Sequence, residues 1–170
     1  GNSLDDCLRW PFQGVEVYNH VCHWLNGKSD GRVHWNALLA RSPGALAVAS
    51  DDSHLRPEHP LWNGGWIKVN TAECSREAVG AALRAGNFFS SRGPDFVSLT
   101  ASGRRVTVET SPVRFIRLVG PAWNGLRWRA DGARPLTGIT LDVPDNWPYA
   151  YIEIEDDGGR LAWSNTLFTD

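Results

Sequence analysis

Residues 47–54 read AVASDDSH, and this stretch decides the fold predicted for the 170-residue chain. The apolar run at 46–49 does not alternate with polar residues, which is typical of a strand covered on both faces. The run ends abruptly in two aspartates and, after a serine, a histidine. Either the chain meets solvent there in a polar turn, or the end of the strand holds a metal ion.

The segments before this stretch predict a parallel strand pair. Residues 14–19, GVEVYN, alternate between apolar and polar side chains and stop at an asparagine, which predicts a strand. Residues 35–41, WNALLAR, have helical spacing and end before a Ser-Pro-Gly turn. Strand, helix and strand in this order indicate a βαβ unit with parallel strands.

A second helix is predicted after the Pro/Gly-rich loop at 55–65. Residues 77–85 place Ala and Val side chains on one stripe, Ser75 is placed to cap the start, and Gly86 is placed to end the helix. Strands are predicted on either side of this helix, at 66–70 and 88–91.

The character of the sequence changes after Pro94. Short β-type runs are punctuated by Gly, Pro, Asn and Asp, and no helix is predicted. The residues 157–159, Asp-Gly-Gly, predict a hairpin turn. The fold class is therefore α/β plus all-β, with an α/β region at 1–94 and a small antiparallel β-sandwich at 95–170. The strands predicted for the sandwich are 96–100, 105–110, 114–119, 138–143, 149–155 and 161–165.

Composition excludes several classes of function. A formal net charge of −2 gives no charge-driven affinity for nucleic acid or an anionic membrane, and no apolar run is long enough to span a bilayer. The three cysteines are irregularly spaced, which argues against a disulfide framework and favours a reducing compartment, the cytoplasm. The chain has no methionine, so we expect it to be part of a longer protein.

The D-x-H of Asp52 and His54 is the first candidate metal site. In an extended chain, residues i and i+2 point the same way, so a carboxylate and an imidazole would lie side by side. Such a pair suits Zn, Mn or Fe. Two ligands do not make a site, however, since a catalytic zinc takes three from the protein. On spacing alone, a solvated turn remains the alternative.

The chain resembles the polymerase-and-histidinol-phosphatase (PHP) family of metal-dependent phosphoesterases, in particular its members with a trailing β domain. The resemblance covers most of the chain and is most specific at SDDSH and FFSSRGP. The matching segments are GVEVYN (14–19), WNALLARS (35–42), AVASDDSH (47–54), GGWIKVNTAE (64–73), AALRAGNFFSSRGPDF (81–96) and the tail YAYIEIEDDGGRLAWSNTLF (149–168).

The resemblance implies the last βα units of a PHP-type barrel, followed by the β-sandwich. Asp52 and His54 would be metal ligands, with Asp51 as a common acidic neighbour. Phosphoester hydrolysis by metal-activated water, with a small-molecule phosphoester as substrate, would follow for the complete protein. The family's early H-x-H is missing from this chain, so we expect an incomplete barrel and an inactive fragment.

Four further residues are weighed near the same rim. His20 and His23, spaced i and i+3, could ligate a metal from one helical face, or they could be polar surface. Arg92 could bind an anionic substrate or lie on the surface. Glu16 lies in the middle of its predicted strand, where an unpaired buried carboxylate would be costly. This favours a salt bridge, or a contact with a metal-binding residue, over direct binding of the metal by Glu16.

Nine tryptophans support an alternative from another class. A Trp-rich β-sandwich could stack on sugar rings or dock a partner, although most tryptophans in folded domains serve packing. A third interpretation is a structural one, in which the chain forms a homo-oligomer that covers exposed strand edges.

Overall fold

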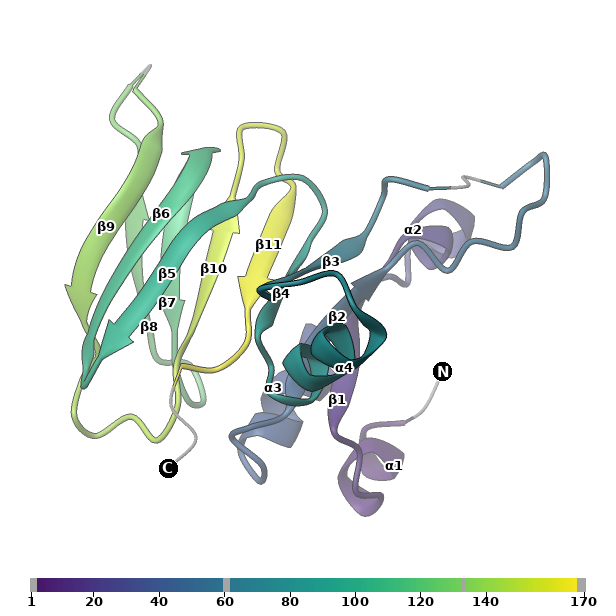
Figure 1. Ribbon diagram of the computed structural model, residues 1–170, viewed down its shortest axis with the longest axis horizontal. Coiled ribbons are helices and arrows are strands. Elements are labelled where there is room, and N and C mark those ends of the chain that lie inside the picture. Colours follow the sequence, from purple (N-terminus) through teal and green to yellow (C-terminus); the bar gives the residue numbers. More distant parts are fainter. Residues whose placement is uncertain (1–2, 60–61, 133, 168–170) are drawn as a thin grey trace.

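The computed structural model describes residues 3–59, 62–132 and 134–167 (Figure 1). Residues 60 and 61 of the predicted loop and Phe168 of the matching tail lie outside these ranges. The architecture is mixed α/β and mostly strands: a parallel pair, a six-stranded sheet and a three-stranded sheet. The described strands do not close into a barrel.

The predicted βαβ unit is confirmed. Strands β1 (Gly14–Asn19) and β2 (Leu46–Ser50) pair in parallel, and α3 (Arg32–Leu39) lies between them in the chain. The helix begins before the predicted Trp35, whose side chain is fully buried, and its indole N–H donates to the carbonyl of Ala45 at 2.8 Å. This bond ties the helix to the residue that precedes β2.

Two short helices were not predicted. Helix α1 (Leu4–Arg9) begins with a capping box between Ser3 and Asp6. Helix α2 (His20–Asn26) begins where β1 ends, because the Asn19 side chain accepts the Cys22 N–H at 2.8 Å, and it stops at Gly27 with φ 72°. Neither helix is long enough to give a clear period in the sequence.

The six-stranded sheet has the order β3-β4-β11-β10-β7-β8. Its strands are β3 (Trp66–Val69), β4 (Phe88–Ser91), β7 (Phe115–Val119), β8 (Gly125–Arg129), β10 (Tyr151–Glu155) and β11 (Leu161–Ser164). The strand β8 was missed, while the predicted helix is confirmed as α4 (Arg76–Arg84), with Ser75 as its N-cap. Strands from both sides of residue 95 pair in this sheet, and the division into 1–94 and 95–170 stays a prediction.

The three-stranded sheet has the order β5-β6-β9, with β5 (Phe96–Ser102), β6 (Arg105–Val113) and β9 (Leu136–Asp142). It packs on one face of the six-stranded sheet, as Figure 1 shows at the left. Val106 and Val108 of this sheet share a core with Ile116 and Ile152 of the larger one, all fully buried. The prediction of antiparallel sheets after Pro94 is confirmed, and no described residue there is helical, but the larger sheet also takes β3 and β4 from before residue 95.

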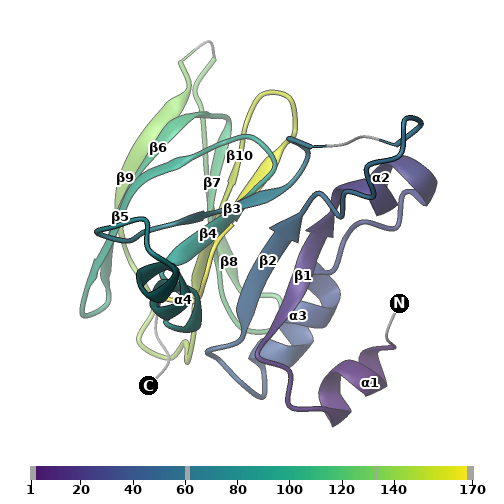
Figure 2. The same ribbon diagram turned by 45° about the vertical axis from the view of Figure 1, so that its right-hand side comes forward.

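The edge of β2 that faces away from β1 lies beside the six-stranded sheet (Figure 2), where Ser90 of β4 and Asn165, just after β11, bond its backbone groups. Ser90 Oγ accepts the Ala49 N–H at 2.9 Å and donates to the Ala47 carbonyl at 2.8 Å. The Ala47 N–H is bound by Asn165 Oδ1 at 2.9 Å. A hydroxyl and an amide thus replace a ladder of backbone bonds, and they fix the parallel pair beside β4 and β11.

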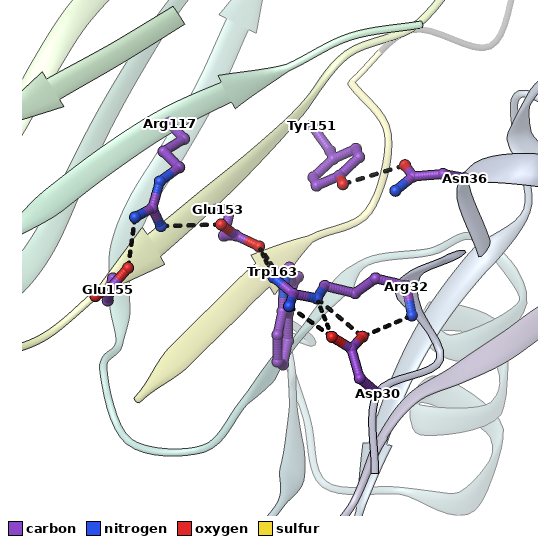
Figure 3. A network of polar contacts seen from close by, with 8 residues as sticks. All are labelled: Asp30, Arg32, Asn36, Arg117, Tyr151, Glu153, Glu155 and Trp163. Atoms are coloured by element: carbon purple, nitrogen blue, oxygen red, sulfur yellow. Dashed lines mark hydrogen bonds and ion pairs between the residues drawn. The ribbon is translucent and has the colours of Figure 1, made fainter. Parts of the chain in front are cut away.

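A buried acid fixes α3 to the other face of the six-stranded sheet (Figure 3). Glu153 of β10 accepts bonds from Arg32 at 3.0 Å, Arg117 at 2.9 Å and the Trp163 indole at 2.8 Å. These donors come from α3, β7 and β11. The parallel pair and its strand ends are therefore held in place by polar contacts from two directions.

Candidate functional site

Polar side chains converge where β1 and β2 end. Asn19 Nδ2 donates to Glu16 Oε2 at 3.0 Å and to Asp52 Oδ2 at 3.1 Å. Ser50 Oγ donates to the other oxygen of Glu16 at 2.5 Å. We call Glu16, Asn19, Ser50 and Asp52 the strand-end cluster. Parallel strands bring their carboxyl ends to one edge, which is where α/β proteins place ligands.

The strand-end cluster carries uncompensated negative charge. Neither Glu16 nor Asp52 forms an ion pair with any described lysine, arginine or histidine. Their bonds come from an amide and a hydroxyl, which satisfy oxygen lone pairs but supply no positive charge. The electrostatic field of two carboxylates around one amide favours a cation at this edge.

Asp52 adopts a backbone conformation that the sequence argument did not foresee. The strand β2 ends at Ser50, and Asp52 has φ 52°, so the premise of an extended chain through Asp52 and His54 is wrong. Left-handed backbone is uncommon outside glycine, although Asp tolerates it better than most residues. It is found disproportionately at functional sites.

His54 is held by its own segment. Its Nδ1 lies 2.7 Å from the backbone oxygen of Asp52. A carbonyl oxygen only accepts, so Nδ1 carries the hydrogen and Nε2 of the neutral ring keeps its lone pair. A backbone bond of this kind is the usual way in which a metal-binding histidine is oriented. Both side chains of the D-x-H are exposed.

The donors of the described residues do not complete a metal site. No three of the His, Cys, Asp and Glu side chains in the described ranges are arranged to hold an ion. A carboxylate at Asp52 and the free Nε2 of His54 suit a divalent metal in kind, but at least one further protein ligand is needed. The described residues therefore form no metal site by themselves, and metal ligation by Asp52 and His54 stays a prediction.

Asp51 bonds the backbone of the loop before β3 and does not bond the strand-end cluster. Its carboxylate accepts the backbone N–H groups of Asn63 at 3.0 Å, Gly64 at 2.7 Å and Gly65 at 2.9 Å. A Cβ on Gly64 would lie 1.9 Å from the ring of His20, so only glycine fits there. Asp51 thus folds the loop end back over the start of α2.

His20, His23 and Arg92 gather around Tyr18. The Tyr18 hydroxyl lies 3.1 Å from His20 Nδ1, and the Arg92 guanidinium lies 4.0 Å from the centre of the Tyr18 ring. The ring of His23 is 5.9 Å from that of Tyr18. Burial raises the pKa of Tyr18, which keeps the phenol neutral. These candidates share one aromatic residue, and none of them has a hydrogen bond to Asp52 or His54.

Sequence reasoning missed three contributors. Asn19 connects the two carboxylates and Ser50 donates to Glu16, and the available signal was an asparagine that both ends a strand and caps a helix. His59, in the loop after β2, is the third: its ring lies 6.0 Å from that of His54 and 5.1 Å from that of Trp24. Its Nδ1 is buried without a hydrogen-bond partner among the described residues.

Comparison with known proteins adds no relative: no family model, no curated protein and no solved structure matches the chain. No helix in the described ranges is both long and apolar enough to cross a membrane, and the cytoplasmic location stays a prediction.

Proposed function

We propose that this chain is the C-terminal portion of a PHP-like metal-dependent phosphoesterase, made of the last units of its barrel and a trailing β-sandwich. It contributes Asp52 and His54 to a divalent-metal site and Arg92 to the neighbourhood of the substrate. The observation that carries the proposal is the strand-end cluster, because it joins an uncompensated carboxylate pair to a D-x-H at the ends of parallel strands.

Each side chain has a defined task in this proposal. Asp52 binds the metal through the carboxylate oxygen that Asn19 leaves free, and His54 binds through Nε2, because its Nδ1 hydrogen is held by the Asp52 carbonyl. Glu16 has both oxygens bonded and adds negative charge beside the ion. The metal would activate water and polarise the phosphoester.

The incomplete ligand set of Asp52 and His54 fits a chain that is inactive alone. The missing ligands come from upstream sequence in this proposal, as the absent H-x-H already suggests. A small-molecule phosphoester is the proposed substrate of the complete protein, and the Arg92 guanidinium is a chemically suitable partner for its phosphate.

The test is metal analysis of the parent protein purified with its upstream sequence. We expect bound divalent metal, and hydrolysis of a generic aryl phosphate that a chelator abolishes. Asp52→Ala and His54→Ala should each remove metal and activity together. The control is Asp142→Ala, because Asp142 lies on β9 of the three-stranded sheet and its carboxylate bonds Arg105. Unchanged metal content after His54→Ala would overturn the assignment.

A second candidate, a carbohydrate- or partner-binding module, is favoured by one observation. Trp35, Trp147 and Trp163 are buried, but Trp123, in the turn between β7 and β8, is 93% exposed. An indole displayed in this way is available for stacking on a sugar ring. Titration with neutral oligosaccharides, followed by tryptophan fluorescence in the native chain and in Trp123→Ala, tests this alternative. Self-association over exposed strand edges is tested separately by gel filtration.

A further inference from the structure

Strand β8 is an edge of the six-stranded sheet, and its polar groups have a regular arrangement. It pairs with β7 on one side and with no described strand on the other. The Ala130 N–H donates to the Arg114 carbonyl at 2.8 Å, and the Gly120 N–H donates to the Asn124 carbonyl at 3.0 Å. These two bonds lie at opposite ends of the hairpin and fix which residues of β8 face β7.

Bonded and non-bonded pairs alternate along an antiparallel ladder. In this register the pairs of Trp128 and Leu126 are the bonded ones, and those of Arg129 and Arg127 are not. The N–H and C=O groups of Arg127 and Arg129 therefore point away from β7. Arg127 and Arg129 thus combine free backbone groups at the edge with cationic side chains, and Gly125, in the non-bonded pair with Val119, offers a third set of backbone groups.

The arginine side chains lie on one face of the sheet. Arg127 is directly opposite Arg117, and Arg129 is opposite Phe115. The guanidinium groups of Arg117 and Arg127 lie 4.8 Å and 5.7 Å from the centre of the Phe115 ring. Arg127 and Arg129 are both exposed, and neither forms an ion pair with a described residue.

The arginines of β8 have no acidic partner in the part of the chain that the structure describes, but Arg117 of the neighbouring strand β7 has two. On the far side of β7, strand β10 carries Glu153 and Glu155 at alternate positions. Both carboxylates bind Arg117, at 2.9 Å and 2.5 Å. Alternating acids on a neighbouring strand are thus the partner that this arginine face already uses within the fold.

We propose that the free edge of β8 is a docking site for an extended acidic peptide, which adds to the sheet as a further strand. Its backbone bonds the outward N–H and C=O groups of Arg127 and Arg129, and its carboxylates, spaced i and i+2, pair with the two guanidinium groups. This site is independent of the strand-end cluster and of the phosphoesterase proposal.

A second copy of the chain is a poor occupant of this edge. Antiparallel pairing of β8 with its own copy sets arginines against arginines, and like charges directly opposite each other destabilise a sheet. Nucleic acid is disfavoured because Glu153 and Glu155 lie on the same face and the chain has a net charge of −2. Alternating carboxylates on a peptide satisfy both the charge and the backbone groups.

The test uses a blocked heptapeptide of sequence TEVEVET, with TQVQVQT as the uncharged control. We expect saturable binding of the acidic peptide and at least about tenfold weaker binding of the control. The double variant Arg127→Glu with Arg129→Glu should lose the acidic peptide and bind TKVKVKT instead. Arg76→Glu, on the exposed side of α4, should leave binding unchanged.

Hydrogen exchange identifies the mode of binding. The N–H groups of Arg127 and Arg129 should gain protection with the acidic peptide, while those of Leu126 and Trp128, already bonded to β7, should not change. Equal binding of heparin or a single-stranded oligonucleotide, without that protection, would show a general polyanion patch and overturn the proposal. Absence of peptide binding would overturn it as well and would leave the arginines as protection against edge-to-edge pairing.

Discussion

The carboxylate of Glu153 in β10 lies 3.0 Å from the guanidinium of Arg32 in α3, and this ion pair joins residues 121 positions apart in the chain. The acid is almost entirely buried, while Arg32 is about one-third exposed. Arg117 and the Trp163 indole donate to the same carboxylate, as Figure 3 shows. One side chain therefore fastens the helix of the parallel unit to three strands of the sheet.

Replacing Glu153 tests how much this network of bonds contributes to stability. In Glu153→Ala, the Trp163 N–H loses its acceptor in a buried position, and two arginines lose a common partner. We expect a loss of about 3 kcal/mol in the free energy of unfolding, since breaking a buried charged network typically costs several kcal/mol. Urea denaturation should show a lower midpoint with an unchanged m-value.

Glu155→Ala is the matched control for that variant. Among the described residues, the Glu155 carboxylate binds only Arg117, and its side chain is more exposed than that of Glu153. A loss of about 1 kcal/mol or less is expected, because a partly solvated pair contributes little. Equal losses for the two variants would mean that the connection to α3 and Trp163 adds no stability.

The Ser90 hydroxyl of β4 connects β4 to the backbone of β2. Ser90→Ala leaves the Ala49 N–H and the Ala47 carbonyl without their buried partner. Unfolding free energy should fall by about 1–3 kcal/mol, the usual cost of an unsatisfied buried polar group. Ser98→Ala, which removes an exposed bond to Glu109, is the control and should shift the urea midpoint much less. A Ser90 variant as stable as its control would contradict the role given to this hydroxyl.

The sequence alone was enough to predict the helices and strands whose signals lie within a few neighbouring residues. The run at 46–49 and the alternation of GVEVYN predicted two parallel strands, and Ser75 and Gly86 marked the ends of α4. In each case, the physics that decides the element acts within a few residues. Helix α2 was missed because its seven residues are too few to show a clear period. Strand β8, GLRWR, does alternate, with Leu126 and Trp128 between arginines, and was overlooked.

The candidate site was predictable only in part, for a related reason. The D-x-H and its place at the end of a strand could be read directly, but Asp52 has φ 52° and its carboxylate bonds Asn19, 33 positions earlier. The bond between Ser50 and Glu16 spans 34 positions. Such contacts depend on the register in which β1 and β2 pair, and no single-sequence pattern gives that register.

Asp51 allows a prediction about the loop that follows β2. Asp51→Ala removes the acceptor of three backbone N–H groups, at Asn63, Gly64 and Gly65. Hydrogen exchange at Gly64 and Gly65 should accelerate, because those amides then bond only to water, while exchange in β7 and β10 stays unchanged. Asp157→Ala, in the β10–β11 turn, is the control. Protection that survives in Asp51→Ala would show that the loop is held by other contacts.

Asp30 should make stability depend on pH in the acid range. Hydrogen bonds from the Arg32 side chain are the main cause that lowers the pKa of this carboxyl below its ordinary 3.8. A lowered folded-state pKa gives stabilisation that is complete above pH 3.8 and is lost as the pH falls through the folded value. Because the side chain is half exposed, solvent screening limits the effect to about 1 kcal/mol or less.

Urea midpoints of the native chain and of Asp30→Asn, measured from pH 7 down to about pH 2, check this sign. The variant should be the less stable of the two at neutral pH, and the difference should shrink in the most acidic samples. In an Arg32→Gln background, Asp30→Asn should have little effect at any pH, because the guanidinium that lowers the pKa is gone. A difference that persists at the lowest pH, or that survives without Arg32, would contradict the assignment of this effect to the Arg32 guanidinium.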